Sequence, residues 1–169
     1  MNQGLMDKFR KVKALILDFD GVLTDGCVFV DSEEGREMVR CSHYDGMGIK
    51  MVRQAGIKVV VVSGQISSYV KTRCKKMGIS FICGVNNKAE AVKRLIDLER
   101  LDSYECVFMG DDLNDIEAIK ISGIIPIAVA NAVPEVKKIA VYITAKKGGE
   151  GAVREVCDLI LKAKGEALK

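Results

Sequence analysis

Several residue types are scarce in this 169-residue chain, and each scarcity excludes a class of protein. The sequence has no tryptophan, two prolines and one histidine, and aromatic residues make up 5% of it. Its core must therefore be aliphatic, built mainly from Val, Ile, Leu, Ala and Met. A chain of this length can bury one such core, so we expect a single domain over residues 1–169.

The cysteines are too dispersed to form a metal or disulfide framework. No C-x-x-C pair occurs, and the lone His43 cannot complete a zinc site by itself. We expect free thiols, as in a reducing compartment. The six cysteines are Cys27, Cys41, Cys74, Cys83, Cys106 and Cys157.

Long apolar runs are also missing. No segment approaches the roughly 18 apolar residues of a membrane-spanning helix, and residues 1–10 lack the apolar part of a signal peptide. We therefore expect a cytoplasmic protein with no membrane partner. The net charge of +3 is too small and too evenly spread to indicate binding to nucleic acid.

What the sequence does contain is an alternation of short aliphatic runs with segments of helical periodicity. The runs cover residues 13–18, 57–62, 105–109, 124–129 and 140–143, and the helical segments cover residues 46–55, 66–77, 88–100, 113–121 and 151–164. This alternation predicts an α/β fold, a single three-layer, Rossmann-like parallel sheet with helices on both faces. Ligands of such sheets bind at the carboxyl ends of the strands.

One segment interrupts the alternation. Residues 26–41 form two short apolar stretches around an acidic turn that contains Gly35. This pattern predicts a β-hairpin that projects from the loop after the first strand.

Two acidic clusters follow predicted strands. Asp18 and Asp20 come directly after the first strand, with Gly21 to turn the chain, and the segment GDDLND at residues 110–115 follows the third. A D-x-D pair alone is common in surface loops, and single acids at a helix start often act as caps. At one sheet edge, however, these carboxylates would repel strongly unless a cation neutralised them. Their oxygen ligands favour Mg²⁺.

Two further positions could bind a phosphate group beside that cation. Ser63 and Gly64 follow the second strand, and Lys88 opens a helix. Taken singly, Ser63 is typical of a helix cap and Lys88 of a solvated surface lysine. The order of all four features makes coincidence a poor explanation.

This order of motifs resembles the haloacid dehalogenase superfamily. The resemblance implies that Asp18 is the nucleophile and Asp20 the general acid and base, and that Ser63, Gly64 and Lys88 contact phosphate. It implies that Asp111 holds Mg²⁺ together with Asp18 and the backbone carbonyl of Asp20. The residues that would support this site are Asp112, Asn114 and Asp115.

Within the superfamily, the chain is similar to the capless group that contains 3-deoxy-D-manno-octulosonate 8-phosphate phosphatase. The similarity rests on LILDFDGVLTDG, the hairpin, DGMGIK at residues 45–50, VFMGDDLND and GGEGAVRE at residues 148–155. It implies no cap domain, a function in lipopolysaccharide biosynthesis, and a homotetramer in which a neighbour's C-terminal segment, about residues 146–164, covers the open site. Substrate or flap contacts would come from Asp45, Gln65, Gly149, Glu150, Gly151 and Arg154.

Three alternatives remain open from the sequence. Octulosonate phosphatases usually carry Arg at the positions of Gln65 and Glu150. The Gly-Glu-Gly flap looks more like relatives that act on nine-carbon keto-deoxy sugar acid phosphates, but those relatives tend to carry Glu at the position of Gln65. A two-component receiver domain, a phospho-accepting switch without turnover, also clusters aspartates around magnesium. An inactive homologue that regulates a sugar-nucleotide synthetase is the third, although every predicted catalytic position is present.

Overall fold

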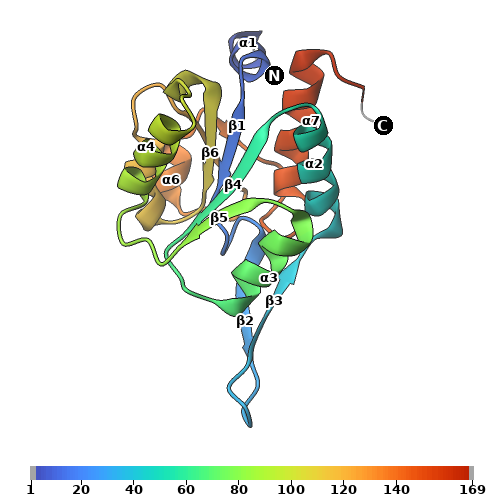
Figure 1. Ribbon diagram of the computed structural model, residues 1–169, viewed down its shortest axis with the longest axis vertical. Helices are drawn as coiled ribbons and strands as arrows, with labels where there is room; N and C mark the ends of the chain where they lie inside the picture. The colour runs from blue at the N-terminus through green and yellow to red at the C-terminus, as the bar shows by residue number, and fades with distance from the viewer. Residues whose placement is uncertain (1–2, 168–169) are drawn as a thin grey trace.

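Six parallel strands form the central sheet of the protein, seen here in a computed structural model that describes residues 3–167 (Figure 1). Their order across the sheet is β5-β4-β1-β6-β7-β8. The strands are β1 (Ala14–Leu17), β4 (Lys58–Ser63), β5 (Ser80–Cys83), β6 (Cys106–Gly110), β7 (Ile125–Ala128) and β8 (Tyr142–Ile143). The predicted α/β class and parallel sheet are thus confirmed.

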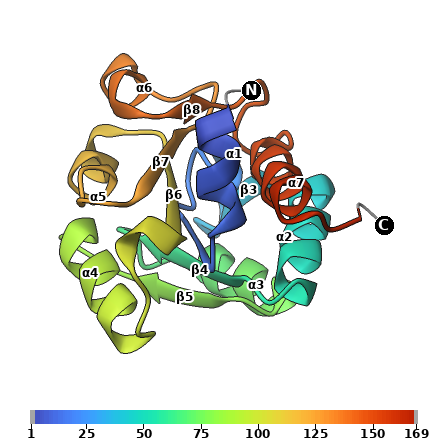
Figure 2. The same ribbon diagram turned by 90° about the horizontal axis from the view of Figure 1, so that it is seen from above.

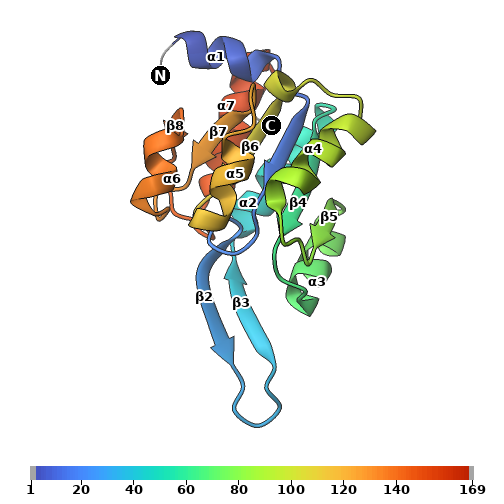
Figure 3. The ribbon, with the colours of Figure 1, turned by 90° about the vertical axis from the view of Figure 1, so that its left-hand side faces the viewer.

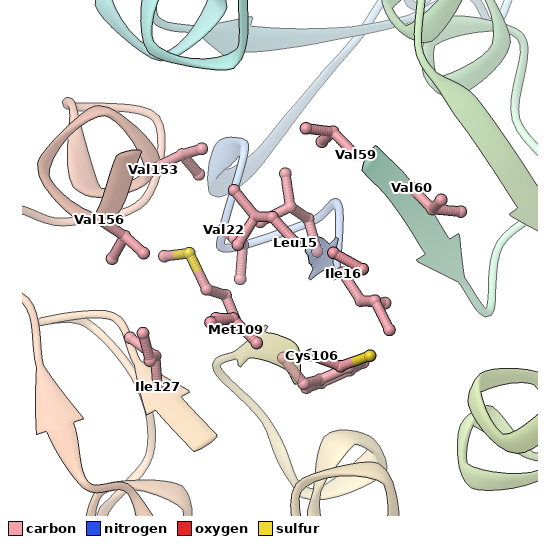
Figure 4. Packing of buried hydrophobic residues seen from close by; sticks show 14 of the residues in the cluster. Leu15, Ile16, Val22, Val59, Val60, Cys106, Met109, Ile127, Val153 and Val156 are labelled. Atoms are coloured by element: carbon pink, nitrogen blue, oxygen red, sulfur yellow. The ribbon is translucent and has the colours of Figure 1, made fainter. Parts of the chain in front are cut away.

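The sheet is parallel because its strands are aliphatic on both faces and connected by helices. All four residues of β1 and all five of β6 are buried, as expected for strands covered on both sides. Figure 4 shows Leu15 and Ile16 of β1 close to Val59 and Val60 of β4 in this core, with Met109 of β6 nearby.

Helices cover both faces of the sheet (Figure 2). One layer holds α4 (Lys88–Leu98), α5 (Ile116–Ile119) and α6 (Pro134–Ile139). On the other side α2 (His43–Gln54) packs against α7 (Ala152–Lys164), α1 (Gln3–Arg10) lies on α7, and α3 (Ser68–Met77) contacts β5. Two short 3₁₀ turns, η1 (Ser103–Glu105) and η2 (Leu113–Asp115), flank β6.

The hairpin extends away from the carboxyl end of the sheet, as the sequence predicted (Figure 3). It consists of β2 (Thr24–Val30) and β3 (Glu37–Cys41), which pair antiparallel. Val39 and Cys41 of β3 are partly buried against the core, whereas Val28, Phe29, Val30 and Met38 are exposed.

Three elements differ from the sequence expectation. The first is α1, which lies in residues 1–10, where no helix was predicted, and the second is α6, a short helix that begins with Pro134. The third is β5, which lies outside the five predicted aliphatic runs and forms one edge of the sheet. No described helix is long and apolar enough to cross a membrane.

Candidate active site

The carboxyl ends of β1, β4 and β6 meet at one edge of the sheet. The chain runs from β1 to β4 and β5 on one side and then returns to place β6 on the other side of β1. Such a reversal opens a crevice at the strand ends, where ligands of α/β sheets bind. The backbone N–H of Asp18 donates to the carbonyl of Met109 over 3.0 Å. This bond fixes Asp18 beside the end of β6, one residue before Gly110.

A glycine turn after β1 brings the first loop against the second acidic cluster. Gly21 adopts a positive φ of 81°, and its N–H donates to Thr24 Oγ1 over 3.0 Å. A Cβ at position 21 would lie 1.9 Å from Asp111 Oδ2. Only glycine therefore lets the loop approach the carboxylate of Asp111 this closely.

Lys88 forms ion pairs with both acidic clusters. Asn87 caps α4 by accepting the N–H of Glu90 over 3.1 Å, and this cap positions Lys88 at the first turn. The ammonium is 3% exposed and lies 2.7 Å from Asp18 Oδ1 and 2.7 Å from Asp115 Oδ1. A buried cation with two carboxylate partners is fixed in place, unlike a solvated lysine.

Asp115 uses both carboxylate oxygens for contacts within the protein. Its Oδ1 accepts the Lys88 ammonium, and its Oδ2 accepts the backbone N–H groups of Asp111 at 2.9 Å and Asp112 at 3.3 Å. Asp112 caps the same turn by accepting the N–H of Leu113 over 2.7 Å. Asp115 therefore orients Lys88 and the Asp111 loop.

The remaining carboxylate oxygens fit a divalent cation. Oxygens of Asp18, Asp111 and Asp115 lie within 4.8 Å of one another. Asp111 Oδ1 is buried without a hydrogen-bond partner in the described structure, which is costly unless a ligand satisfies it. Because both oxygens of Asp115 and Oδ1 of Asp18 are already engaged, the oxygens available to a metal are Oδ2 of Asp18 and those of Asp111. An all-oxygen set of this kind suits Mg²⁺.

The electrostatics of the site favour the binding of a cation. Burial, followed by the charge of Asp115, raises the pKa of Asp18 to about 7, although Lys88 opposes the rise. Burial and the charge of Asp18 raise the pKa of Asp111 to about 8. A bound cation would lower both pKa values again by stabilising the ionised carboxylates.

A hollow of about 240 Å³ opens above these carboxylates. Ser63 is buried at the end of β4, and its Oγ accepts the N–H of Gln65 over 3.2 Å. Gly64 lies exposed in the same turn, with room for a close backbone approach. The hollow is lined by Asp18, Asp20, Gly21, Gly26, Gln65, Asp111, Asp112 and Asn114. The structure thus brings together most of the predicted site residues.

The predicted flap residues lie beside this hollow and do not line it. The backbone N–H of Gly149 donates to Val22 O over 3.1 Å, which places the flap, residues 146–151, against the loop after β1. Glu150 pairs with Arg40 of the hairpin at 2.8 Å. This position is compatible with a cover over the site.

Asp45 and Arg154 contact each other where α2 meets α7. Asp45 is buried, and its Oδ1 accepts the backbone N–H of Arg154 over 2.8 Å, near the first turn of α7 after Gly151. The guanidinium of Arg154 pairs with Asp158 at 2.7 Å. Their predicted contact with substrate stays a prediction.

One connecting residue was missed by the sequence reasoning. Asn131 donates its side-chain N–H to Gly21 O over 2.9 Å and accepts the N–H of Gly148 over 2.7 Å. It thereby links the glycine turn to the flap. Its position shortly after β7, at the same sheet edge, is the sequence feature that could have indicated this role.

Comparison with known proteins agrees with this geometry. A profile of the haloacid dehalogenase-like hydrolase family matches residues 84–156. The 3-deoxy-D-manno-octulosonate 8-phosphate phosphatase of Escherichia coli is 36% identical over 167 residues, which cover 98% of this chain and 88% of the relative.

Solved structures extend the similarity to the whole fold. The crystal structure of the corresponding Moraxella catarrhalis phosphatase, in complex with magnesium, phosphate and KDO, has a TM-score of 0.93 at 36% identity and covers 98% of this chain and 94% of that one. The cobalt-bound Haemophilus influenzae enzyme has a TM-score of 0.88 at 35% identity, covering 94% and 92%. This chain therefore belongs to the haloacid dehalogenase-like hydrolases, as a phosphatase without a cap domain.

Proposed function

We propose that this protein is a magnesium-dependent phosphomonoesterase that hydrolyses 3-deoxy-D-manno-octulosonate 8-phosphate, a reaction of lipopolysaccharide biosynthesis, through a phosphate ester on Asp18. The observation that carries this proposal is the buried arrangement of Asp18, Lys88 and Asp111 at the sheet edge, with one Asp111 oxygen unsatisfied. The named relatives support the substrate class.

The metal would be held by Asp18 and Asp111 and, as the resemblance implies, by the backbone carbonyl of Asp20. When bound, Mg²⁺ would neutralise the phosphoryl oxygens, so that an anionic nucleophile can approach them. Asp115 would keep the Asp111 loop in place through its bonds to the backbone N–H groups of Asp111 and Asp112.

Different residues of the chain would carry out the separate steps of the reaction. One oxygen of Asp18 pairs with Lys88, which orients the carboxylate and favours its ionised, nucleophilic form. Asp20 is half-buried at the rim and would protonate the leaving alkoxide, then accept a proton from the attacking water. Ser63 and the backbone of Gly64 would hold the phosphoryl group at the end of β4.

The exposed hairpin supports the homotetramer. Val28, Phe29, Val30 and Met38 are 45–65% exposed. Exposed apolar side chains on a projecting hairpin are typical of an interface. We infer that hairpins associate, and that a neighbour's C-terminal segment covers the open hollow. A cytoplasmic location stays a prediction of the sequence.

The decisive experiment is phosphate release from two substrates by the purified protein. We expect turnover of the eight-carbon 3-deoxy-D-manno-octulosonate 8-phosphate with magnesium and its loss with a chelator. A nine-carbon keto-deoxy sugar acid phosphate should react more slowly. Faster turnover of the nine-carbon compound would favour the alternative substrate that Glu150 suggests. Phosphorylation of one equivalent without turnover would instead indicate a receiver domain.

A further inference from the structure

The turn between the two acidic clusters is carried by a glycine, the residue that restrains its own backbone least. Gly21 follows Asp20, and a Cβ on it would collide with the carboxylate of Asp111. Its φ is 81°. Glycine adopts positive and negative φ about equally well. The peptide planes before and after Gly21 therefore keep one orientation only if other groups hold them.

Thr24 holds the plane before Gly21. The N–H of Gly21 donates to the Oγ1 of the buried Thr24 over 3.0 Å. No peptide bond in the described chain is cis, so the carbonyl of Asp20 points away from this N–H in the same plane. The direction of the Asp20 carbonyl is thus set from within the turn.

Asn131 holds the plane after Gly21. Its side-chain N–H donates to Gly21 O over 2.9 Å, and its side-chain carbonyl accepts the N–H of Gly148 over 2.7 Å. A backbone carbonyl can only accept and a backbone N–H can only donate, so one orientation of the amide satisfies both partners. The Asn131 residue is exposed, so hydrogen bonds rather than burial keep its amide in place.

The flap gives this amide a closely packed partner. Gly148 and Gly149 are buried, although the residues around them in the flap are mostly exposed. A Cβ at Gly148 would lie 1.8 Å from Gly21 O, and one at Gly149 would lie 2.6 Å from the backbone nitrogen of Asp25. The two glycines therefore let the flap backbone pack directly on the turn, and Asn131 fastens the turn to that surface.

We propose that Asn131 is a positioning residue for the metal site: by fixing the peptide plane after Gly21, it keeps the Asp20 loop against the carboxylate of Asp111, so that both can contact one cation. Ligands that are held in place before the metal arrives lose less conformational entropy when it binds. The inference rests on the proposed function, because it assigns Asn131 a part only in the binding of magnesium.

Magnesium affinity, measured without substrate, tests this role. We expect Asn131→Ala to raise the Kd for Mg²⁺ roughly fivefold to tenfold in calorimetric titration of the metal-free protein, the effect of losing one or two neutral hydrogen bonds. With p-nitrophenyl phosphate, the magnesium concentration for half-maximal activity should rise by a similar factor. The rate at saturating magnesium should stay within about twofold of the wild type, because Asn131 contacts neither substrate nor nucleophile.

Two further variants separate positioning from general loosening. Ser103→Ala removes a 2.7 Å bond to Ser122 O that joins two loops near the amino end of β6, and it should leave the Kd within about twofold. Asn131→Leu keeps the approximate size without polar atoms and should match Asn131→Ala; it decides the question if the alanine variant does not fold.

Three results would overturn the role of Asn131. They are an unchanged Kd in the folded Asn131 variants, an equal rise in the Kd for Ser103→Ala, and a rate that does not recover at saturating magnesium. Absence of magnesium binding by the wild-type protein would instead overturn the proposed function itself.

Discussion

Two acids of the site, the buried Asp18 and the half-buried Asp111, make the stability of the metal-free protein depend on pH. Both titrate near 3.8 as free side chains, and in the folded protein the pKa rises to about 7 and about 8. Between about pH 4 and about pH 8, the folded protein therefore keeps protons on these two carboxyl groups that the unfolded chain has already released. The free energy of unfolding of the metal-free protein should therefore decrease as the pH rises from about 4 to about 8.

Magnesium should reverse this loss where the carboxylates are ionised. We expect added Mg²⁺ to raise the unfolding temperature more near pH 8 than near pH 5.5, since the metal binds deprotonated ligands. Thermal unfolding with magnesium or with a chelator measures the difference. Asp111→Asn should abolish most of the magnesium effect, whereas Asp97→Asn, on the exposed side of α4, should not. An equal magnesium effect at both pH values would contradict this account of the site.

The convergence of the acids was predictable because strand ends are visible in the sequence. Asp18 and Asp111 each follow an aliphatic run, and parallel strands deliver such residues to one edge. The contacts of Asn131 with Gly21 and Gly148 were not predictable. They depend on where a loop lies over that edge, and no local pattern records that.

At the scale of elements, the contact between α2 and α7 depends on Gly48. A Cβ there would lie 3.0 Å from Arg154 Cα and 3.1 Å from Cys157 Cβ. We expect Gly48→Ala to lower the free energy of unfolding by about 1–3 kcal/mol through overpacking, although alanine gains about 1 kcal/mol of helix propensity. Urea unfolding measures this change.

Gly46→Ala provides the matched control on the same helix. Its Cβ would meet only the guanidinium of Arg73, which lies 3.3 Å away and donates to Ser42 O over 2.9 Å. The end of a long side chain can shift by a few tenths of an ångström more easily than the backbone of α7, so the propensity gain should make the substitution neutral or stabilising. Equal effects of the two substitutions would mean that helix packing at Gly48 is not tight.

Helices and strands with long sequence patterns were predicted more accurately than those with short patterns. Long periodic segments, such as that of α7, and buried runs, such as that of β6, were located correctly. The short helices α1 and α6 were missed, since six to eight residues hold too few turns for a clear periodicity. Their positions depend on tertiary contacts, because α1 packs on α7 and α6 packs on β7.

At the scale of the whole molecule, the exposed hairpin predicts self-association. Phe29 is 59% exposed near the end of β2. We expect the wild-type protein to form a tetramer, and Phe29→Glu to shift it to smaller species, because a buried charge would destabilise the apolar contact. Size-exclusion chromatography with light scattering measures the mass of each species.

Leu98→Glu is the control for this test, since Leu98 is 71% exposed on α4, away from the hairpin. It should leave the mass unchanged. A monomeric wild-type protein, or a tetramer that tolerates Phe29→Glu, would contradict the hairpin interface. The sequence of one chain shows an apolar hairpin but not how many copies meet there, which depends on the geometry between subunits.

The central claim is that Asp18 is the nucleophile of a magnesium-dependent phosphatase. Its most direct test is the rate of phosphate release from 3-deoxy-D-manno-octulosonate 8-phosphate, with magnesium, by the wild-type protein and by Asp18→Asn, both shown to be folded by circular dichroism. We predict a loss of roughly 10³-fold or more for Asp18→Asn and little change for Asp97→Asn. A rate for Asp18→Asn within about tenfold of the wild type would contradict the account.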